Sequence, residues 1–544
     1  MPVRPLVKWL AAPFLLILAG VAAFLVGAGA GAPPSPGAAQ EPVTEAWVAR
    51  YDGPSSQDDY ALALAVDGAG NVYVTGESRG SGITTDYATI KYGPDGSQQW
   101  AARYDGPAGR EDGASGLAVD GSGNVYVTGA SKGPGSFWDY ATIKYGPDGS
   151  QQWLARYDGP VSALDIAAVL AVDGSGNVYV TGQSEGPGTI PDYATIKYGP
   201  DGTQQWVARY DGPASGLEAA FAVAVDGSGN VYVTGQSEGP GTGPDYATIK
   251  YGPDGRQQWA ARYSSPGSGE DSYDRAEALA VDGSGNVYVT GYGRTIKYGP
   301  DGTEEWAAPR GGQAIAVDAS GNAYVAAGAG TVKYGPDGSE QWQASYPGSA
   351  SRLALDGSGN VYVTGWSEGS GTGYDYATVK YGPDGTQQWV ARYDGPGGDD
   401  DDDYPQALAV DGSGNVYVTG FSEGSGTERD YATIKYSQAP PPTPSPPPPP
   451  PPPGDTEDIP LEDGTCNPVA STYPDATPIA TIAGAVAPPN LLEGLWEFDG
   501  VTWLGYSPHF PAASNLTQMN QLDVVFICVG GSGPGAAMFT RPVI

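Results

Sequence analysis

Histidine, cysteine and basic residues are all scarce in this chain. Among 544 residues there is one histidine, His509, and there are two cysteines, Cys466 and Cys528. Because His509 is the only histidine and lies near the C-terminal end, the rest of the chain has no histidine of its own for a Ser-His-Asp triad. Two thiols cannot cross-link the whole chain, so the sequence leaves two alternatives, one local Cys466–Cys528 disulfide in an oxidising compartment or two unpaired thiols.

The charge balance is strongly acidic. Only 26 residues are Lys or Arg, against 62 Asp or Glu, which gives a net charge of -36. A phosphate backbone would be repelled by such a surface, so nucleic acid is excluded as a partner.

The N-terminal segment has the pattern of an export signal. Arg4 and Lys8 precede an apolar run from Trp9 to about Ala32, and Ala28-Gly29-Ala30 resembles a small-residue cleavage site. The run is also long enough to span a bilayer. We therefore expect residues 1–32 to be a signal peptide or a membrane anchor, and 33–44 a flexible linker. Either alternative predicts a secreted or cell-envelope protein that meets the membrane only through this segment.

What the chain does contain is glycine, proline and aromatic residues in a repeating order. There are 84 Gly, 50 Pro, 36 Tyr and 13 Trp, which is typical of an all-β protein with many short strands. The segment Asp-Gly-Ser-Gly-Asn-Val-Tyr-Val-Thr-Gly recurs eight times with small changes, beginning at Asp67, Asp120, Asp173, Asp226, Asp282, Asp318, Asp356 and Asp411. A second block, Lys-Tyr-Gly-Pro-Asp-Gly, recurs seven times, and each copy is followed by a Trp, from Trp100 to Trp389.

Each repeat predicts four strands joined by tight turns, as in 169–173, 177–181, 192–198 and 204–210. Bulky residues occupy both faces of the second strand, as expected for a sheet packed between two others. The chain therefore predicts a β-propeller over 45–437, with eight blades by repeat count and seven as the alternative. A lone fourth strand at Trp47–Tyr51 and a final third strand at Asp430–Tyr436 predict closure of the ring, which removes exposed edges.

These units resemble the SBBP repeat, a bacterial repeat named after the seven-bladed β-propeller. The resemblance is carried by Val172 to Gly182 and its seven counterparts, within 47–436. It implies an exported bacterial protein and supplies no reaction. The Asp-Gly-x-x-x-Trp pattern, as in Asp95 to Trp100, is also similar to the tryptophan-docking motif of eight-bladed quinoprotein dehydrogenases. That similarity implies tryptophans packed between blades.

The remainder of the chain has a different composition. Residues 438–456 are proline-rich and predict a stiff, disordered linker, and 457–544 predict a small β-rich domain. Within it, Leu495–Phe498 and Val501–Leu504 predict a hairpin on a two-residue turn, and Leu522–Val529 predicts a further strand.

Two motifs in the repeats imitate functional sites. Gly-x-Ser-x-Gly, as in Gly182 to Gly186, follows a strand rather than beginning a helix, and it occurs six times. It therefore indicates repeat structure, not the nucleophile elbow of a hydrolase. Asp-Gly-Ser-Gly-Asn alternates oxygen ligands, but without the closing Glu of an EF-hand it predicts a turn.

An acid at one position of the repeat is a candidate cation ligand. Eight residues before the motif aspartate stand Asp59, Asp112, Asp165, Glu218, Asp274 and Asp403. Solvated loop ends are one interpretation, and a cation ring at the channel rim, with Ca²⁺ as the ion, is the other. Asp399 to Asp403 adds five acids there, and Arg310 and Gly348 interrupt the series.

Loop lengths vary on one face only. The connections between strands 2 and 3, and between strand 4 and the next strand 1, share a face and carry all the length variation, which marks a candidate binding surface for an extracellular protein or a glycan. The sequence favours a non-catalytic binding or structural scaffold. The alternative is a propeller enzyme, acting on polysaccharide or resembling a quinoprotein dehydrogenase, because fold alone excludes neither.

Overall fold

A computed structural model describes two units of the chain. In the first, residues 43–438 are described, apart from 81–83, 136, 189, 266–272, 370–372 and 398–400. In the second, the backbone of nine strands between 456 and 542 is described. The chain forms two compact units, residues 1–439 and 440–544, each with its own internal contacts. The predicted signal segment 1–32 and nearly all of the predicted linker 438–456 lie outside the described residues.

The described residues of the first unit form strands and turns, without a helix. No helix in the described part of the chain has the length and apolar character needed to cross a membrane. The strands of the first half are β1 (Val43–Tyr51), β2 (Asp59–Val66), β3 (Val72–Arg79), β4 (Thr85–Tyr92), β5 (Gln98–Tyr104), β6 (Asp112–Val119), β7 (Val125–Ser131), β8 (Asp139–Tyr145), β9 (Gln151–Tyr157), β10 (Asp165–Val172), β11 (Val178–Glu185), β12 (Pro191–Tyr198), β13 (Gln204–Tyr210), β14 (Glu218–Val225), β15 (Val231–Glu238), β16 (Pro244–Tyr251) and β17 (Gln257–Tyr263). The second half continues with β18 (Ala276–Val281), β19 (Val287–Gly291), β20 (Thr295–Tyr298), β21 (Glu304–Ala308), β22 (Ala314–Val317), β23 (Ala323–Tyr334), β24 (Glu340–Leu355), β25 (Val361–Glu368), β26 (Tyr374–Tyr381), β27 (Gln387–Tyr393), β28 (Tyr404–Val410), β29 (Val416–Gly424) and β30 (Thr427–Gln438).

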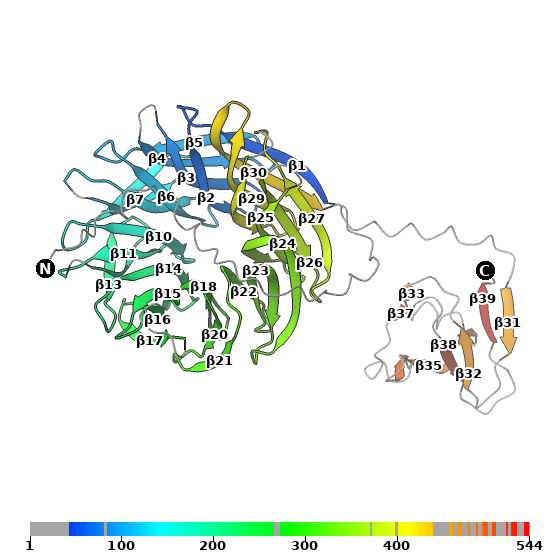
Figure 1. The fold of residues 1–544 in the computed structure, drawn as a ribbon. Coiled ribbons are helices and arrows are strands. Elements are labelled where there is room, and N and C mark those ends of the chain that lie inside the picture. Colours follow the sequence, from blue (N-terminus) through cyan, green and yellow to red (C-terminus); the bar gives the residue numbers. More distant parts are fainter. Residues whose placement is uncertain are drawn as a thin grey trace. The chain divides into compact units, whose positions relative to one another are not determined.

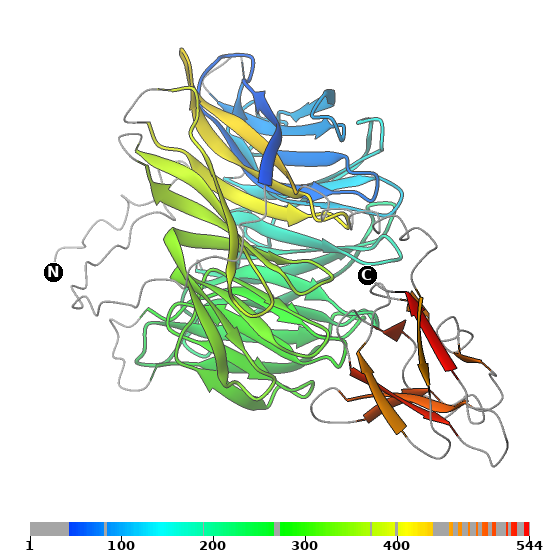
Figure 2. The ribbon, with the colours of Figure 1, turned by 90° about the vertical axis from the view of Figure 1, so that its right-hand side faces the viewer.

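These strands build a propeller of antiparallel sheets arranged around an axis (Figure 1), seen from the side in Figure 2. Counted as hydrogen-bonded sheets, the propeller has seven blades, six with four strands and one with six strands, β22 to β27. The count of eight blades is therefore wrong, and the alternative of seven blades is confirmed. The shortest connections lie between the second and third strands of the sixth repeat and between the sixth and seventh repeats. The strands there continue without a break as β23 and β24, so the two repeats share one sheet.

The ring closes as predicted, through β1 and β30 (Figure 1). The two strands are antiparallel, with Trp47 opposite Lys435 and Tyr51 opposite Tyr431. The innermost strands contact one another in order from β2 to β28, and β28 contacts β2 again. No edge strand is left open between the first and last repeats.

Each hairpin between the first and second strands is held by its own aspartate. In the third repeat, Asp173 Oδ1 accepts the backbone N–H groups of Ser175 and Asn177, both at 2.9 Å. Its Oδ2 accepts Asn177 Nδ2 at 2.7 Å and the Tyr179 hydroxyl at 3.0 Å. These donors hold the pKa of Asp173 below its usual range despite partial burial. The motif is a turn, as predicted, whose carboxylate is already satisfied by protein donors.

The core lies between blades. A typical cluster combines Tyr126 and Tyr140 of one blade with Val178, Val180 and Ile196 of the next, all buried. Both faces of the second strand are thus covered, as its sequence predicts. Apolar burial of this kind is the main stabilising contribution to the ring.

The tryptophans pack at these same interfaces, as the docking motif implies. The indole of Trp153 packs in a tilted arrangement 6.2 Å from Tyr126 in its own blade and 6.4 Å from Tyr198 in the next, measured between ring centroids. Its Nε1 donates to the Pro200 carbonyl at 3.0 Å. The turn glycine beside that proline, Gly202, has φ +83° and lies directly under the indole.

The second unit contains β31 (Thr456–Pro460), β32 (Cys466–Ala470), β33 (Thr477–Pro478), β34 (Val486–Ala487), β35 (Leu492–Phe498), β36 (Trp503–Tyr506), β37 (Gln518–Met519), β38 (Val524–Val529) and β39 (Met538–Pro542). The expected hairpin is present, but Phe498 pairs with Trp503, so its connection is longer than two residues. Cys466 stands opposite Cys528 in the β32–β38 ladder. Their side chains lie outside the described residues, so the disulfide stays a prediction.

Candidate functional site

Carboxylates gather at the junctions between consecutive blades. Five groups of three acids have oxygens within 4.8 Å of one another: Asp52, Asp59 and Asp430; Asp86, Asp105 and Asp112; Asp139, Asp158 and Asp165; Asp192, Asp211 and Glu218; Asp375, Asp394 and Asp403. One acid begins the third strand or lies early in it, one follows the fourth strand, and one begins the next first strand or directly precedes it. All three positions lie on the face of the variable loops.

The structure divides the predicted acid series among separate groups. Asp59, Asp112, Asp165, Glu218 and Asp403 each belong to a different group, and all five are buried rather than solvated. The sixth, Asp274, is also buried and accepts Ser265 N–H at 2.7 Å. It belongs to no group of three, and Ser264 occupies the position where the five junctions with an acid group have an aspartate.

Sequence reasoning missed the other two members of each group. They come from Tyr-Asp-Gly after the fourth strand and from Asp-Tyr-Ala-Thr at the third strand. Both segments recur in the same repeats as the predicted acid, and that coincidence was the available signal. Because the strands are antiparallel, the end of the fourth strand, the start of the first and the start of the third meet at one edge of the blades.

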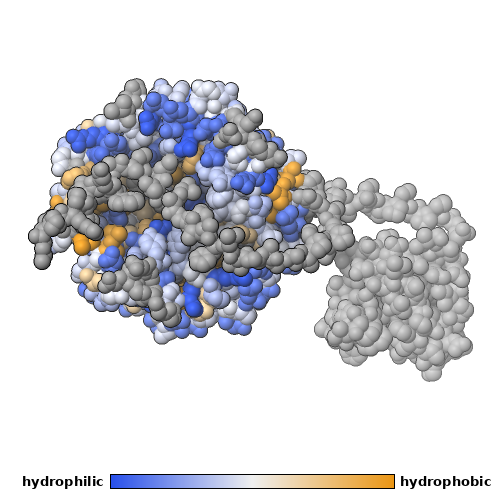
Figure 3. All heavy atoms as spheres, viewed as in Figure 1, coloured by the Kyte–Doolittle hydropathy of each residue, from blue (hydrophilic) through white to orange (hydrophobic). Residues whose placement is uncertain are grey.

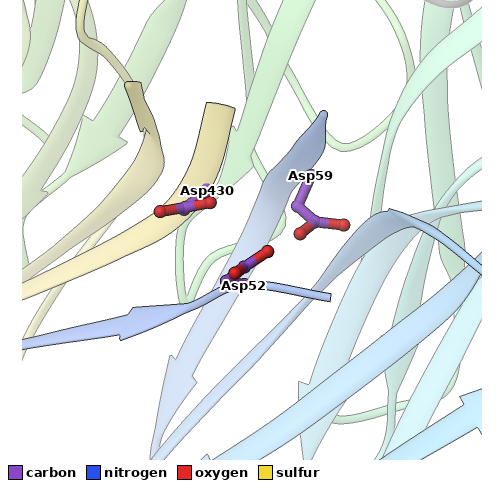
Figure 4. A group of neighbouring side chains, drawn as sticks. All are labelled: Asp52, Asp59 and Asp430. Atoms are coloured by element: carbon purple, nitrogen blue, oxygen red, sulfur yellow. The ribbon is translucent and has the colours of Figure 1, made fainter. Parts of the chain in front are cut away.

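Figure 4 shows the group that closes the ring, with the carboxylates of Asp52, Asp59 and Asp430 turned toward a common space. Asp59 accepts the backbone N–H groups of Gly53 at 2.5 Å and Arg79 at 3.1 Å. Asp430 Oδ2 accepts Arg50 Nη2 at 2.9 Å, while its buried Oδ1 accepts no hydrogen bond from the described residues.

In every group, burial raises the pKa of the acid at the start of the next first strand. It raises the pKa of Asp59, Asp112, Asp165 and Asp403 to about 6, and that of Glu218 to about 7. Neighbouring acids of the same group add to the rise, as Asp158 and Asp139 do at Asp165. Backbone and serine donors oppose it only in part.

An arginine of the fourth strand contributes one positive charge to each group. Arg156 Nη2 lies 2.6 Å from Asp139 Oδ2, and its Nη1 donates to the Ser131 hydroxyl. Ser131 is the serine of a Gly-x-Ser-x-Gly motif, and Ser184 receives Arg209 in the same way at 2.6 Å. The motif serine therefore positions an arginine, and the only histidine, His509, lies outside the described residues.

The family comparison agrees with the repeat. The family model described as the SBBP β-propeller repeat matches residues 103–136 and 388–425. This chain contains SBBP β-propeller repeats. Both matched segments of the SBBP propeller begin within a fourth strand and run to the loop after the next second strand. They therefore include the junction acids Asp105, Asp112, Asp394 and Asp403.

No curated protein matches the SBBP propeller. Solved structures with a similar fold include a protein of unknown function from Bacteroides caccae, with 14% identity and TM-score 0.31, covering 49% of this chain and 93% of that one. Another, of unknown function from Dyadobacter fermentans, has 10% identity and TM-score 0.33, covering 73% and 99%. A structure titled putative gluconolactonase has 14% identity and TM-score 0.30, covering 60% and 89%.

Aromatic residues distinguish some SBBP repeats from the others. In one group, the rings of Tyr273 and Tyr292 lie 6.0 Å apart, with the Arg275 guanidinium over both. In a second, ring contacts run in sequence through Trp366, Tyr374, Tyr404, Phe421 and Tyr60. Tyr292, Trp366 and Phe421 occupy one repeat position, after Thr-Gly, where other repeats have Glu77, Ala130, Gln183 and Gln236.

Proposed function

We propose that this SBBP propeller is an exported, non-catalytic scaffold that binds a partner outside the cell or at the cell envelope. Export is supported by the apolar segment after Arg4 and Lys8. Binding is supported by where the surface departs from the repeat. The ligand class stays as the sequence predicts, an extracellular protein or a glycan.

A single observation carries the proposal. Six large hydrophobic side chains are exposed among the described residues, and five of them, Phe137, Val161, Ile190, Tyr273 and Tyr292, belong to connections on the variable-loop face. Figure 3 shows apolar patches on an otherwise mainly hydrophilic or neutral surface. Exposed apolar groups that gather on one face are typical of interaction surfaces.

The opposite face lacks this variation in the described residues. Its turns repeat Asp-Gly-Ser-Gly-Asn and Gly-Pro-Asp-Gly with few changes, and their aspartates are engaged with their own turns. A binding surface on the loop face, supported by a constant ring, fits the usual division between variable loops and rigid scaffold.

The enzyme alternative receives less support. A glycosidase needs one distinguished pair of carboxylates in a cleft. Here the acids form five groups of three carboxylates at equivalent junctions. That repetition favours a structural role for each group over one catalytic centre.

The proposal is tested with the full chain on a glycan array and on an array of bacterial envelope proteins. We expect binding to at least one class, and loss of that binding when Tyr273 and Tyr292 are both replaced by alanine. The matched control is Leu154→Ala, because Leu154 is exposed at 38% but lies in β9, away from the loops. Turnover of a polysaccharide, or oxidation of an alcohol by the purified chain, would contradict the proposal and support the enzyme.

A further inference from the structure

The junction between the second and third repeats holds more carboxylate oxygens than its protein donors satisfy. Asp139 begins β8, Asp158 follows β9 and Asp165 begins β10. One oxygen of each lies within 4.8 Å of the others. Asp139 Oδ2 is taken by Arg156 at 2.6 Å, and Asp165 Oδ2 by Gly159 N–H at 2.7 Å.

The remaining oxygens of the two buried acids have no donor in hydrogen-bonding geometry, although the Ser184 side chain lies near Asp165. Asp139 Oδ1 and Asp165 Oδ1 are buried and accept no hydrogen bond from the described residues. Asp139 is 5% exposed and Asp165 is 0% exposed. A buried carboxylate oxygen without a partner is costly, because it has lost water and gained nothing in return. The same occurs at Glu218 Oε2, Asp403 Oδ1 and Asp430 Oδ1, each in a group of its own.

The charge of the group points to a divalent cation. Three ionised carboxylates carry three negative charges, and the Arg156 guanidinium supplies one positive charge. Two negative charges are left in a partly buried space, where their mutual repulsion is weakly screened. One divalent cation balances this charge.

We propose that Ca²⁺ binds at the blade junctions of this propeller, with Asp139, Asp158 and Asp165 as one site and Asp52, Asp59 and Asp430 as the site that closes the ring. The donors are oxygens, without a thiol or an imidazole in any group. Oxygen-only sites with carboxylates of varied geometry favour calcium over zinc, and over magnesium, which requires a near-octahedral shell.

Each ion links two consecutive blades. Asp139 and Asp158 belong to the blade formed by β6 to β9, whereas Asp165 begins the next blade. In the closing site, Asp430 and Asp52 belong to the last blade, and Asp59 to the first complete blade. A cation that binds only the assembled junction stabilises the folded ring by mass action.

Ser264 provides an internal comparison. Its junction keeps the buried Asp245 and Asp274, and Ser264 stands at the position of Asp158. With two carboxylates and Arg262 bound to Asp245, this junction carries one negative charge less than the others. Ser264→Asp is therefore expected to add a site.

The test is isothermal titration of the metal-free full chain with calcium chloride in about 0.15 M salt, where loose counterions are screened. We expect saturable binding with up to five ions per chain, one for each group. Asp158→Asn should lower the number of bound ions by one, and Ser264→Asp should raise it by one. Asp158 is exposed, so its amide replacement preserves the fold, which near-ultraviolet circular dichroism checks.

The matched control is Asp148→Asn, an exposed aspartate in the Gly-Pro-Asp-Gly turn of the same repeat, which should leave the number unchanged. Binding that magnesium reproduces equally, or that disappears in the added salt, would overturn the proposal, since it would reflect only the acidic surface. Unchanged stoichiometry in both Asp158→Asn and Ser264→Asp would also overturn it. These outcomes do not depend on partner binding by the loop face.

Discussion

The indole nitrogen of Trp47 donates a hydrogen bond to the carbonyl oxygen of Pro94, 3.0 Å away. Trp47 lies in β1, which completes the last blade, and Pro94 lies in a turn of the first complete blade. The bond therefore connects the two ends of the ring. Equivalent bonds join consecutive repeats up to Trp342 and Pro383, which lie in the shared six-stranded sheet. Trp389 differs, because the last repeat has no Gly-Pro-Asp-Gly turn, and its buried Nε1 has no partner among the described residues.

Removing β1 should open the ring. We expect a fragment of residues 41–438, which keeps Val43–Tyr51, to fold as a stable monomer. A fragment of residues 53–438 leaves the outer edge of β30 without its partner, and exposed edges promote association between chains. Size-exclusion chromatography and thermal melting compare the two. Equal melting temperatures and a monomeric shorter fragment would contradict closure through β1.

Two glycines of one repeat should respond differently to alanine. Gly202 has φ +83°, and a Cβ there would lie 2.8 Å from the Trp153 ring. Strain in the left-handed region and overpacking predict that Gly202→Ala lowers the free energy of unfolding by about 2 kcal/mol or more. Gly174 has no atom within 4 Å of its Cβ position, so Gly174→Ala should change stability little. Urea unfolding measures both, and equal losses would argue against docking of the tryptophan on this turn.

The turn aspartates should contribute measurably to stability. Asp173→Ala removes acceptors for four donors of its own hairpin, and charge-assisted bonds predict a loss of about 2 kcal/mol. Ser175→Ala is the control, since Ser175 is exposed and contributes its backbone N–H to Asp173. Chelation should lower the stability of wild type and of Asp173→Ala equally, because the junction groups do not include Asp173. If calcium rather than the hairpin donors were the partner of Asp173, chelation would lower the stability of wild type more than that of the variant.

The repeat made most of the fold predictable. Val178 and Tyr179 recur with their turn residues in most repeats, and so do Trp153 and its docking turn, so period and patterning agree on four short strands. The shared sheet of the sixth and seventh repeats was less accessible. That shared sheet depends on whether strand pairing continues across short connections such as Ala327–Gly330. Backbone hydrogen bonds decide this, and composition does not.

The candidate site was predictable only in part. The constant spacing of Asp165 from the motif aspartate made its position predictable. Its burial was not predictable, because a residue at the start of a strand, beside a loop, is usually solvated. Asp139 and Asp158 lie beside Asp165 because antiparallel pairing brings separate segments of the sequence to the same edge of the blades. The aromatic contacts of Tyr273 with Tyr292 depend on loops whose paths the repeat does not determine.

The stability of the propeller should depend on pH through the buried Glu77. This side chain lies in β3, and burial raises its pKa from 4.5 to about 7. The folded state therefore holds a proton more tightly than the unfolded state, so the stabilising effect is full below about pH 4.5 and is lost as the pH rises to about 7. The shift corresponds to about 3 kcal/mol. Two other repeats have glutamine at this position, Gln183 and Gln236, so Glu77→Gln suits the fold. Urea unfolding in chelator should show the variant more stable than wild type at pH 8, and nearly equal to it at pH 4.5. The difference between the two proteins cancels the titration of the junction acids, and a difference independent of pH would contradict the buried, protonated Glu77.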